Sequence, residues 1–240
     1  PETWQQPSQE IMDVLNAPML PWVWTSPTGT HMIMADPVVY PKLEELAAPM
    51  HKLAGMRVNP SNNAAHGQHG GTSPRLLSIK DKITTTIDIP EGTELMGVRW
   101  TVDGKRFALI VGYPDHLGLW IGTTGGEVRE VMNVELNTLL GTAVAWLPDQ
   151  QRLLLLRIPD RGDPPPTPAI RIGPEINESM GATARSTYEA RNLLVTAHDD
   201  DLFDYYTLSQ PVVYDPTSET FEVLGEPAVY SGVEFSPDGN

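Results

Sequence analysis

An all-β fold is predicted by three features of this 240-residue sequence. A phrase made of an aromatic residue and a turn occurs four times, and a run typical of a β-strand follows its first three copies. The 20 glycines and 23 prolines can supply many turns, and 40% hydrophobic residues suffice for a core. A repeated strand–turn–strand unit is typical of β-propeller blades. The sequence therefore predicts a partial β-propeller, with about three four-stranded blades, the start of a fourth, and short helical insertions.

The four copies of the phrase set the register of the predicted blades. They begin at Trp24, Trp100, Trp146 and Phe235, and Pro, Asp and Gly in them favour turns. The interval from Trp100 to Trp146 is close to the length of one blade. The interval from Trp146 to Phe235 is about one blade plus an insertion of similar length. Aromatic residues at one repeated position indicate packing between blades rather than ligand stacking.

The first predicted blade (23–96) follows a lead-in (1–22) whose apolar residues have helical spacing. An insertion (37–74) interrupts this blade. A short helix around Leu43–Ala47 is expected in it, stopped by Pro49, and a loop rich in Gly, Asn, Ser and His follows. The strands of this blade are expected to open at 23–24 and to continue at 31–35, 75–79 and 84–89.

The second blade (97–142) and the third (143–230) have clearer strand signals. Hairpin turns are expected at 102–105 and 124–126. An insertion (160–208) with a Pro-rich start and a helix near 188–194 divides the third blade. Leu153–Leu156 form a continuous apolar run, which predicts a strand covered on both faces. Residues 231–240 would begin the next blade. The strands are expected at 97–100, 106–111, 118–121 and 127–132, and at 143–146, 151–158, 211–214 and 220–224.

Charge and composition exclude several classes of function. The formal net charge of −15 argues against binding to nucleic acids or anionic membranes, because both need clustered Lys and Arg. The absence of cysteine excludes disulfides, Cys-ligated metals and a thiol nucleophile within this chain. No run approaches the roughly 20 apolar residues of a membrane span. No cofactor is expected.

Several stretches, taken in order, resemble a known family. They are Pro7–Pro18 (PSQEIMDVLNAP), Leu43–Pro60 (LEELAAPMHKLAGMRVNP), Leu139–Pro148 (LLGTAVAWLP), His198–Gln210 (HDDDLFDYYTLSQ) and Phe235–Gly239 (FSPDG). They resemble the N-terminal propeller of prolyl-oligopeptidase-type serine peptidases, most closely the glutamyl endopeptidase branch. The resemblance implies a propeller that gates peptide access to a C-terminal α/β-hydrolase domain, with cleavage possibly after Glu.

The resemblance places the catalytic residues outside this chain. In that family the serine nucleophile sits in a Gly-x-Ser-x-Gly turn. No serine of this chain has glycine at both −2 and +2, so the chain is expected to be non-catalytic by itself. The start at Pro1, without Met or an apolar signal core, suggests a processed or trimmed terminus. The compartment stays open between a bacterial periplasm or exterior and the chloroplast stroma.

Two arginines are candidates for substrate binding. Arg157 and Arg161 flank the start of the Pro-rich insertion. A Glu-selective enzyme needs a cation for the substrate side chain, and a guanidinium is well shaped for a carboxylate. The alternative is that both are surface arginines that balance an acidic chain.

Three residues of the second insertion are further candidates. Asp201, in the acidic run 199–201, could hold a peptide amine, or the run could cap the N-terminus of a helix. Tyr205 and Tyr206 could reach a substrate carbonyl, or they could belong to an interface or core. His66 and His69 are close in sequence but lack a third positioned ligand, so no metal site is expected.

The sequence also leaves a second function open, a non-catalytic periplasmic propeller that serves as a scaffold for protein interactions. An incomplete ring would expose unpaired strand edges, which favours self-association and a possible homo-oligomer. Reading the gene beyond Asn240 would discriminate between the peptidase and the scaffold.

Overall fold

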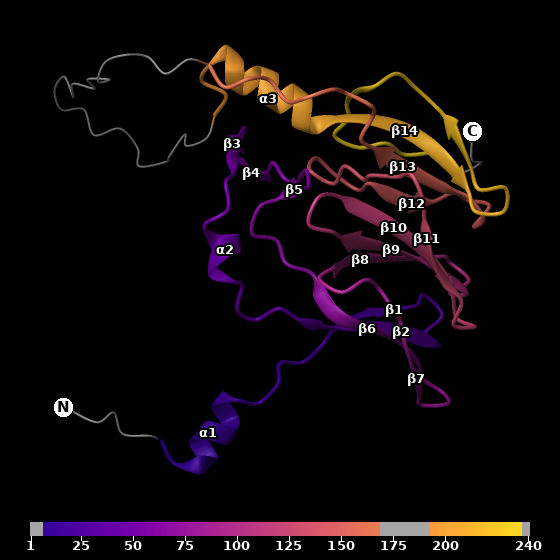
Figure 1. Ribbon diagram of the computed structural model, residues 1–240. Coiled ribbons are helices and arrows are strands. Elements are labelled where there is room, and N and C mark those ends of the chain that lie inside the picture. Colours follow the sequence, from indigo (N-terminus) through magenta and orange to yellow (C-terminus); the bar gives the residue numbers. More distant parts are fainter. Residues whose placement is uncertain (1–6, 169–192, 237–240) are drawn as a thin grey trace, which may run out of the picture.

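The computed structural model describes residues 7–168 and 193–236. Within these residues the chain is mostly β-structure, in several antiparallel sheets of which none is closed (Figure 1). The helix expected near 188–194 lies almost wholly outside the described residues, as does most of the fourth repeated turn. The helices of the described part are α1 (Gln9–Leu15), α2 (Leu43–Leu46) and α3 (Ala197–Thr207).

The larger strands form three meanders, each of four antiparallel strands in sequence order. The first and middle meanders are joined into one eight-stranded sheet by a single residue pair, Gly71 opposite Leu95. The first consists of β1 (Trp22–Thr25), β2 (His31–Pro37), β6 (Gly71–Ser78) and β7 (Ile83–Thr86). The middle consists of β8 (Glu94–Trp100), β9 (Arg106–Gly112), β10 (Leu117–Thr123) and β11 (Val128–Val131). The third consists of β12 (Val144–Trp146), β13 (Leu153–Arg157), β14 (Leu208–Asp215) and β15 (Thr220–Val223), and β16 (Ala228–Val229) pairs with the start of β14.

A separate small sheet lies in the first insertion and was not predicted. It consists of β3 (His51–Leu53), β4 (Met56–Asn59) and β5 (Ala64–Ala65). The loop expected at 59–74 is therefore partly strand, since β5 lies in it and β6 begins at Gly71. Strands of two to four residues are too short to show an alternating pattern, and Gly and Asn in their turns resemble a loop.

The middle meander is covered on both faces. Along β9, Phe107, Leu109 and Val111 pack in a core with the first meander, whereas Ala108 and Ile110 pack in a core with the third. Successive side chains of a strand point to opposite faces, so each face needs its own apolar partner. The three meanders therefore lie as successive layers, as Figure 1 shows from β1 to β14.

The third meander repeats this arrangement. Leu153 and Leu155 of β13 pack toward the middle meander, whereas Leu154 packs on the opposite face with Val213 and the side chain of Phe235. The prediction that the leucine run is covered on both faces is confirmed. The aromatic residue of the fourth repeated phrase is what covers part of the outer face.

The repeated tryptophans link neighbouring meanders through their indole N–H groups. Trp100 Nε1 donates to the backbone oxygen of Trp24 at 3.1 Å, and Trp146 Nε1 donates to the backbone oxygen of Arg99 at 2.8 Å. The neighbouring turns also touch, since a Cβ at Gly104 would lie 2.5 Å from Thr28 Oγ1. The packing role expected for the repeated aromatic position is therefore what the structure shows.

We expect Trp146→Phe to lower the free energy of unfolding by about 1–2 kcal/mol. The phenyl ring keeps much of the apolar contact, but the hydrogen bond from the indole to the backbone oxygen of Arg99 is lost. Urea unfolding measures the change. Trp22→Phe is the matched control, because the Trp22 side chain is 40% exposed. Equal losses in the two variants would show that the hydrogen bond does not matter.

Candidate functional site

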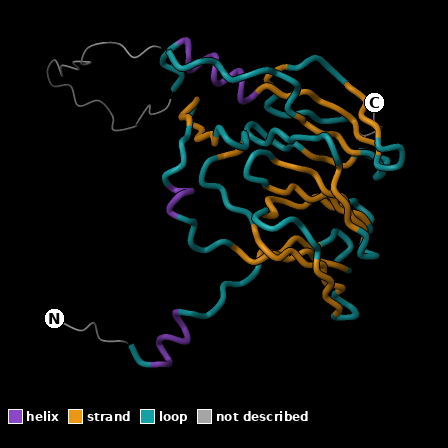
Figure 2. The backbone as a smooth tube through the Cα atoms, in the orientation of Figure 1, coloured by secondary structure: helices purple, strands orange, loops and turns teal. Residues whose placement is uncertain are grey.

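The connections between the second and third strands of the three meanders emerge at one end of the sheets. The first and third carry the long insertions, and the middle one is the short loop between β9 and β10. Figure 2 shows α2, β3–β5 and α3 gathered at this end, with the tight hairpin turns at the other. We call this end the insertion face. It brings segments that are far apart in sequence to one surface.

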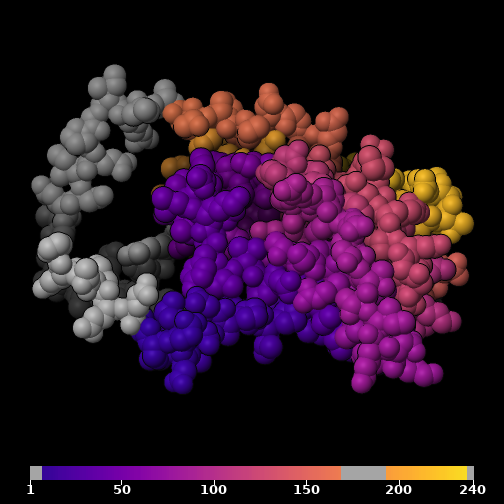
Figure 3. All heavy atoms as spheres, turned by 60° about the horizontal axis from the view of Figure 1, so that its bottom comes forward, coloured from indigo at the N-terminus to yellow at the C-terminus, as the bar shows by residue number. Residues whose placement is uncertain are grey.

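The two insertions pack against each other. Leu53 and Val58 of the small sheet form a buried cluster with Leu202 and Tyr206 of α3. Figure 1 shows β3–β5 just below α3, and Figure 3 shows the first insertion beneath the chain that precedes residue 169. The described parts of the two insertions therefore form one packed unit rather than two independent loops.

The helix α3 begins with a capping box. Thr196 Oγ1 accepts from the backbone N–H of Asp199 at 3.2 Å, and Asp199 Oδ2 accepts from the backbone N–H of Thr196 at 2.9 Å. These hydrogen bonds lower the pKa of the Asp199 carboxyl. The helix-cap interpretation of the acidic run thus holds for Asp199. Asp201 lies exposed on α3, and its side chain forms no hydrogen bond or ion pair with any described residue.

Arg161 joins the two insertions. Its Nη2 donates to Asn63 Oδ1 at 2.7 Å, and its Nη1 donates to the backbone oxygen of Tyr205. The guanidinium carbon lies 4.0 Å from the centre of the Tyr205 ring and 5.7 Å from that of Tyr206. Burial lowers the pKa of Arg161 from its high usual value. Both of these hydrogen bonds therefore serve the packing of the insertions.

Two buried asparagines, which the sequence did not single out, complete this junction. Asn63 Nδ2 and Asn137 Nδ2 both donate to the backbone oxygen of Tyr206, at 3.0 and 2.9 Å, and Asn137 Nδ2 also reaches the backbone oxygen of Leu208 at 3.1 Å. Both side chains satisfy the end of α3, where backbone carbonyls lack helical partners. Asparagine in a loop is too common a turn residue to have signalled this role.

A pocket of about 660 Å³ lies beside this junction, and we call it the insertion-face pocket. It brings together three of the five candidate residues, Arg157, Arg161 and Tyr205. Tyr206 is only 3% exposed and packs in the insertion cluster, and neither it nor Asp201 lines the pocket. The other lining residues are His116, Glu130, Val131, Met132, Asn133, Val134, Glu135, Ile158, Pro159, Asp160 and Gly162.

Arg157 keeps its charge available to a ligand. Its Nη2 and Nε donate to the neutral amide oxygen of Gln210, at 2.8 and 3.3 Å. It forms no ion pair with a described carboxylate. Glu130, Glu135 and Asp160 also line the pocket. The pocket therefore presents charges of both signs, which suits the amine, amide and carboxylate groups of a peptide.

The short loop of the middle meander contributes a stacked pair to the same face. The rings of Tyr113 and His116 lie 4.3 Å apart and nearly parallel. The Tyr113 hydroxyl donates to Glu130 Oε1 at 2.7 Å and accepts from Trp120 Nε1 at 3.0 Å. Burial first, and then Glu130, raise the pKa of Tyr113 to about 12. The hydroxyl therefore stays a neutral donor, and this network was not predicted.

The histidines of the first insertion do not meet in a ligand set. His69 Nδ1 lies 3.8 Å from Glu45 Oε2, and His66 Nε2 is buried without a hydrogen-bond partner. Among residues 7–168 and 193–236, no group of three His, Cys, Asp or Glu side chains could hold a metal ion. Within the same residues, no helix has both the length and the apolarity for crossing a membrane.

Comparisons with known proteins give the family. No family model matches the chain. The probable chloroplastic glutamyl endopeptidase of Oryza sativa subsp. japonica is 32% identical over 97% of this chain, and that of Arabidopsis thaliana is 31% identical over 97%. Over nearly its whole length the chain is therefore related to a part of these peptidases. It covers 26% and 25% of the length of these two relatives. The resemblance found in the sequence is confirmed.

Solved structures are less similar to this chain than these two relatives are. The acylaminoacyl peptidase of Pyrococcus horikoshii aligns with 87% of this chain and 26% of its own, at 13% identity and a TM-score of 0.42. TolB from Acinetobacter baumannii aligns with 95% of this chain and 48% of its own, at 13% identity and a TM-score of 0.37. TM-scores this low carry no argument about a shared fold.

We expect Arg161→Lys to loosen the junction between the insertions. Lysine keeps the charge but cannot reach Asn63 and the Tyr205 backbone oxygen together with one planar fork. Amide exchange in β3–β5 and α3 should rise about tenfold, measured by hydrogen–deuterium exchange. Arg57→Lys, on the exposed face of β4, is the control. Unchanged exchange in Arg161→Lys would contradict the linking role.

The junction should also weaken in acid. The His51 ring lies 5.2 Å from that of Tyr206, and burial first, then the charge of His198, lower the pKa of His51. The neutral imidazole is therefore favoured, so its stabilisation is present above a pH of about 6.5 and is lost as pH falls through the lowered pKa. Imidazole titration by NMR should show the pKa of His51 rising toward its usual value in His198→Gln. An unaltered pKa would contradict this electrostatic coupling.

Proposed function

We propose that this chain is the propeller part of a serine peptidase and that it controls the access of peptides to a catalytic site on another domain of the same protein. The observation that carries the proposal is the relationship to glutamyl endopeptidases over 97% of the chain. The chain itself has no Gly-x-Ser-x-Gly turn. The catalytic serine would therefore lie on a C-terminal α/β-hydrolase domain. The alternative of a non-catalytic scaffold is less favoured, because the matched relatives are named as peptidases.

In this proposal the three meanders are propeller blades. The blades span about 23–96, 97–142 and 143–230, the next blade begins at 231, and the insertions span about 37–74 and 160–208. Two features support this division. The meanders share one strand order and pack face to face, and Phe235 already covers part of the outer face of the third.

Gating would be steric. A ring of blades leaves a narrow channel, which admits an extended peptide and excludes a folded protein. The insertion face would lie toward the hydrolase domain, because the segments gathered there are the ones that depart from the plain blade pattern. The contacts of Arg161 and the two asparagines would keep that surface in one shape, so that a bound peptide is oriented for attack.

Within the insertion-face pocket, Arg157 would pair with the carboxylate of a substrate Glu. Its present hydrogen-bond partner is a neutral oxygen, so its charge is not taken up by an ion pair with a described carboxylate. Tyr205 would form the wall of the pocket, with its hydroxyl donating to the backbone oxygen of Gly162 at 3.0 Å. Arg161 would position this wall rather than bind substrate.

The test is a pair of peptides that differ only in Glu or Gln before the cleaved bond, assayed with the full-length protein. We expect Arg157→Gln to lower kcat/KM for the Glu peptide about tenfold or more and to leave the Gln peptide nearly unchanged. Arg57→Gln is the control for the loss of one charge. A serine-reactive probe labels the protein if the peptidase proposal is right. Equal losses for both peptides would refute the role of Arg157, whereas absent labelling and hydrolysis would refute the proposed function.

A further inference from the structure

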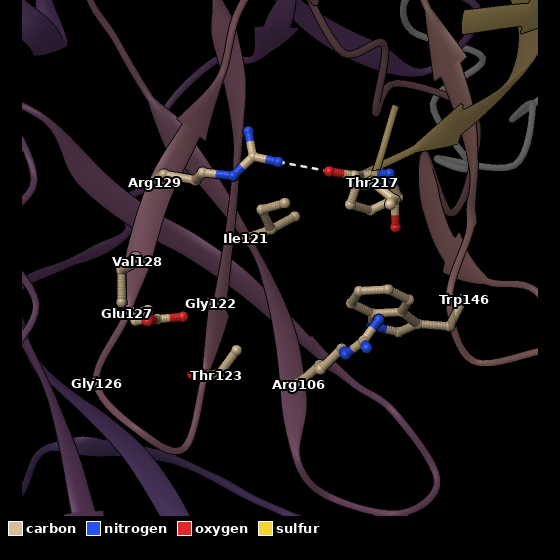
Figure 4. A pocket seen from close by; sticks show the side chains of 11 residues that line it. Arg106, Ile121, Gly122, Thr123, Gly126, Glu127, Val128, Arg129, Trp146 and Thr217 are labelled. Atoms are coloured by element: carbon tan, nitrogen blue, oxygen red, sulfur yellow. Dashed lines mark hydrogen bonds between the residues drawn. The ribbon is translucent and has the colours of Figure 1, made fainter. Parts of the chain in front are cut away.

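A second pocket, of about 650 Å³, lies at the end of the sheets opposite the insertions. It lies between the hairpin of β10 and β11 in the middle meander and the end of β12 and the turn after β14 in the third (Figure 4). We call it the turn-face pocket. β9 and β10 run the whole way between the two ends, since Arg106 pairs with Thr123 at this end and Gly112 with Leu117 at the other. The two pockets are therefore separate.

The walls of the turn-face pocket are held in place without a ligand. Arg129 Nη2 donates to the backbone oxygen of Pro216 at 2.8 Å, and its Nη1 lies 2.8 Å from Glu219 Oε1. These contacts tie the edge strand of the middle meander to the turn of the third. The indole of Trp146 is fixed by its own hydrogen bond. Gly122 leaves room for the Phe107 ring, which would lie 2.5 Å from a Cβ there.

The turn-face pocket combines an apolar surface with charged side chains at its sides. Ile121, Val128 and Trp146 supply the apolar surface, and Figure 4 shows Arg106 and Arg129 on different sides of it. Arg106, Arg129 and Glu127 are the charged residues that line the pocket, and Glu219 balances the charge of Arg129. A ligand with an apolar body and a negative group would complement the apolar surface and the guanidinium of Arg106.

Arg106 is the cation that such a ligand would meet. The charge of Arg129 is already balanced by Glu219, whereas the exposed Arg106 guanidinium has no hydrogen bond or ion pair with any residue in the described part of the chain. The Asp103 carboxylate interacts electrostatically with the Arg106 guanidinium but forms no hydrogen bond with it. The hydrogen bonds that Asp103 accepts come from the Thr101 hydroxyl and the backbone N–H of Lys105. A free guanidinium beside an apolar wall can hold a carboxylate with two parallel hydrogen bonds.

We propose that the turn-face pocket binds a peptide segment in which a carboxylate stands beside an aromatic or aliphatic side chain. The apolar side chain lies against Trp146, Ile121 and Val128, and the carboxylate pairs with Arg106. A volume of about 650 Å³ is enough for a few residues of an extended peptide. The carboxylate comes either from a chain terminus or from an internal Asp or Glu. This site is independent of the proposed peptidase function, because it lies at the other end of the sheets.

Isothermal titration calorimetry on the full-length protein tests the proposal, with a serine-reactive inhibitor present so that peptides are not consumed. Three probes are compared: an acetylated Gly-Gly-Phe with a free C-terminal carboxylate, the same peptide with a C-terminal amide, and an amidated peptide with an internal Glu-Phe pair. We expect at least one carboxylate probe to bind about tenfold more tightly than the neutral probe. Which of the two binds identifies the source of the carboxylate.

Variants locate the binding. Arg106→Gln should remove the preference for the carboxylate, and Arg106→Lys should keep part of it, because lysine retains the charge but loses the fork. Arg57→Gln, which removes an exposed arginine at the insertion face, should bind as the parent protein does. The proposal is overturned if no carboxylate probe binds more tightly than the neutral one, or if Arg106→Gln and Arg57→Gln weaken binding equally.

Discussion

The layered structure depends on apolar packing between successive meanders, in which a repeated tryptophan also donates a hydrogen bond to the backbone of the preceding meander. Trp100 and Trp146 each place a large apolar ring and one N–H donor at the same point of a repeated unit. The ring fills space between two meanders, and the indole N–H adds a hydrogen bond to a backbone carbonyl of the preceding meander. Phe235 supplies only the ring, and it packs against the outer face of the third meander. Hence each layer is positioned by the one before it.

The stacking of the meanders determines where the candidate site residues lie. The equivalent connections of all three meanders reach one end of the sheets, so insertions that are distant in sequence meet there. Arg161 then connects them through a polar fork and two aromatic rings. Arg157, at the end of β13, donates a hydrogen bond to the neutral amide oxygen of Gln210. In the proposed function, this positive side chain, which forms no ion pair with a described carboxylate, would pair with an anionic group of the substrate.

Much of the strand pattern was predictable because it is local. The repeated aromatic and turn phrases give the register of the hairpins, and all twelve strands of the three meanders begin or end close to the expected positions. The leucine run Leu153–Leu156 correctly indicated that apolar residues cover both faces of its strand. The small sheet β3–β5 was not predicted, because its strands are shorter than the period that reveals a strand. Its stability comes from contact with α3, which is distant in sequence.

The candidate site likewise has features that the sequence predicted and features that it did not. Residue chemistry alone pointed to Arg157, Arg161, Asp201, Tyr205 and Tyr206, and homology alone gave the peptidase family. Whether each side chain faces a pocket, a neighbour or solvent was decided by packing between segments that no local pattern connects. The sequence by itself determined the repeated strand–turn unit and its aromatic position, since both depend on residues a few positions apart. Only the tertiary structure decided that Tyr206 is buried, that Asn63 and Asn137 hold the end of α3, and that Arg106 stands free beside Trp146, because these follow from contacts across the layers.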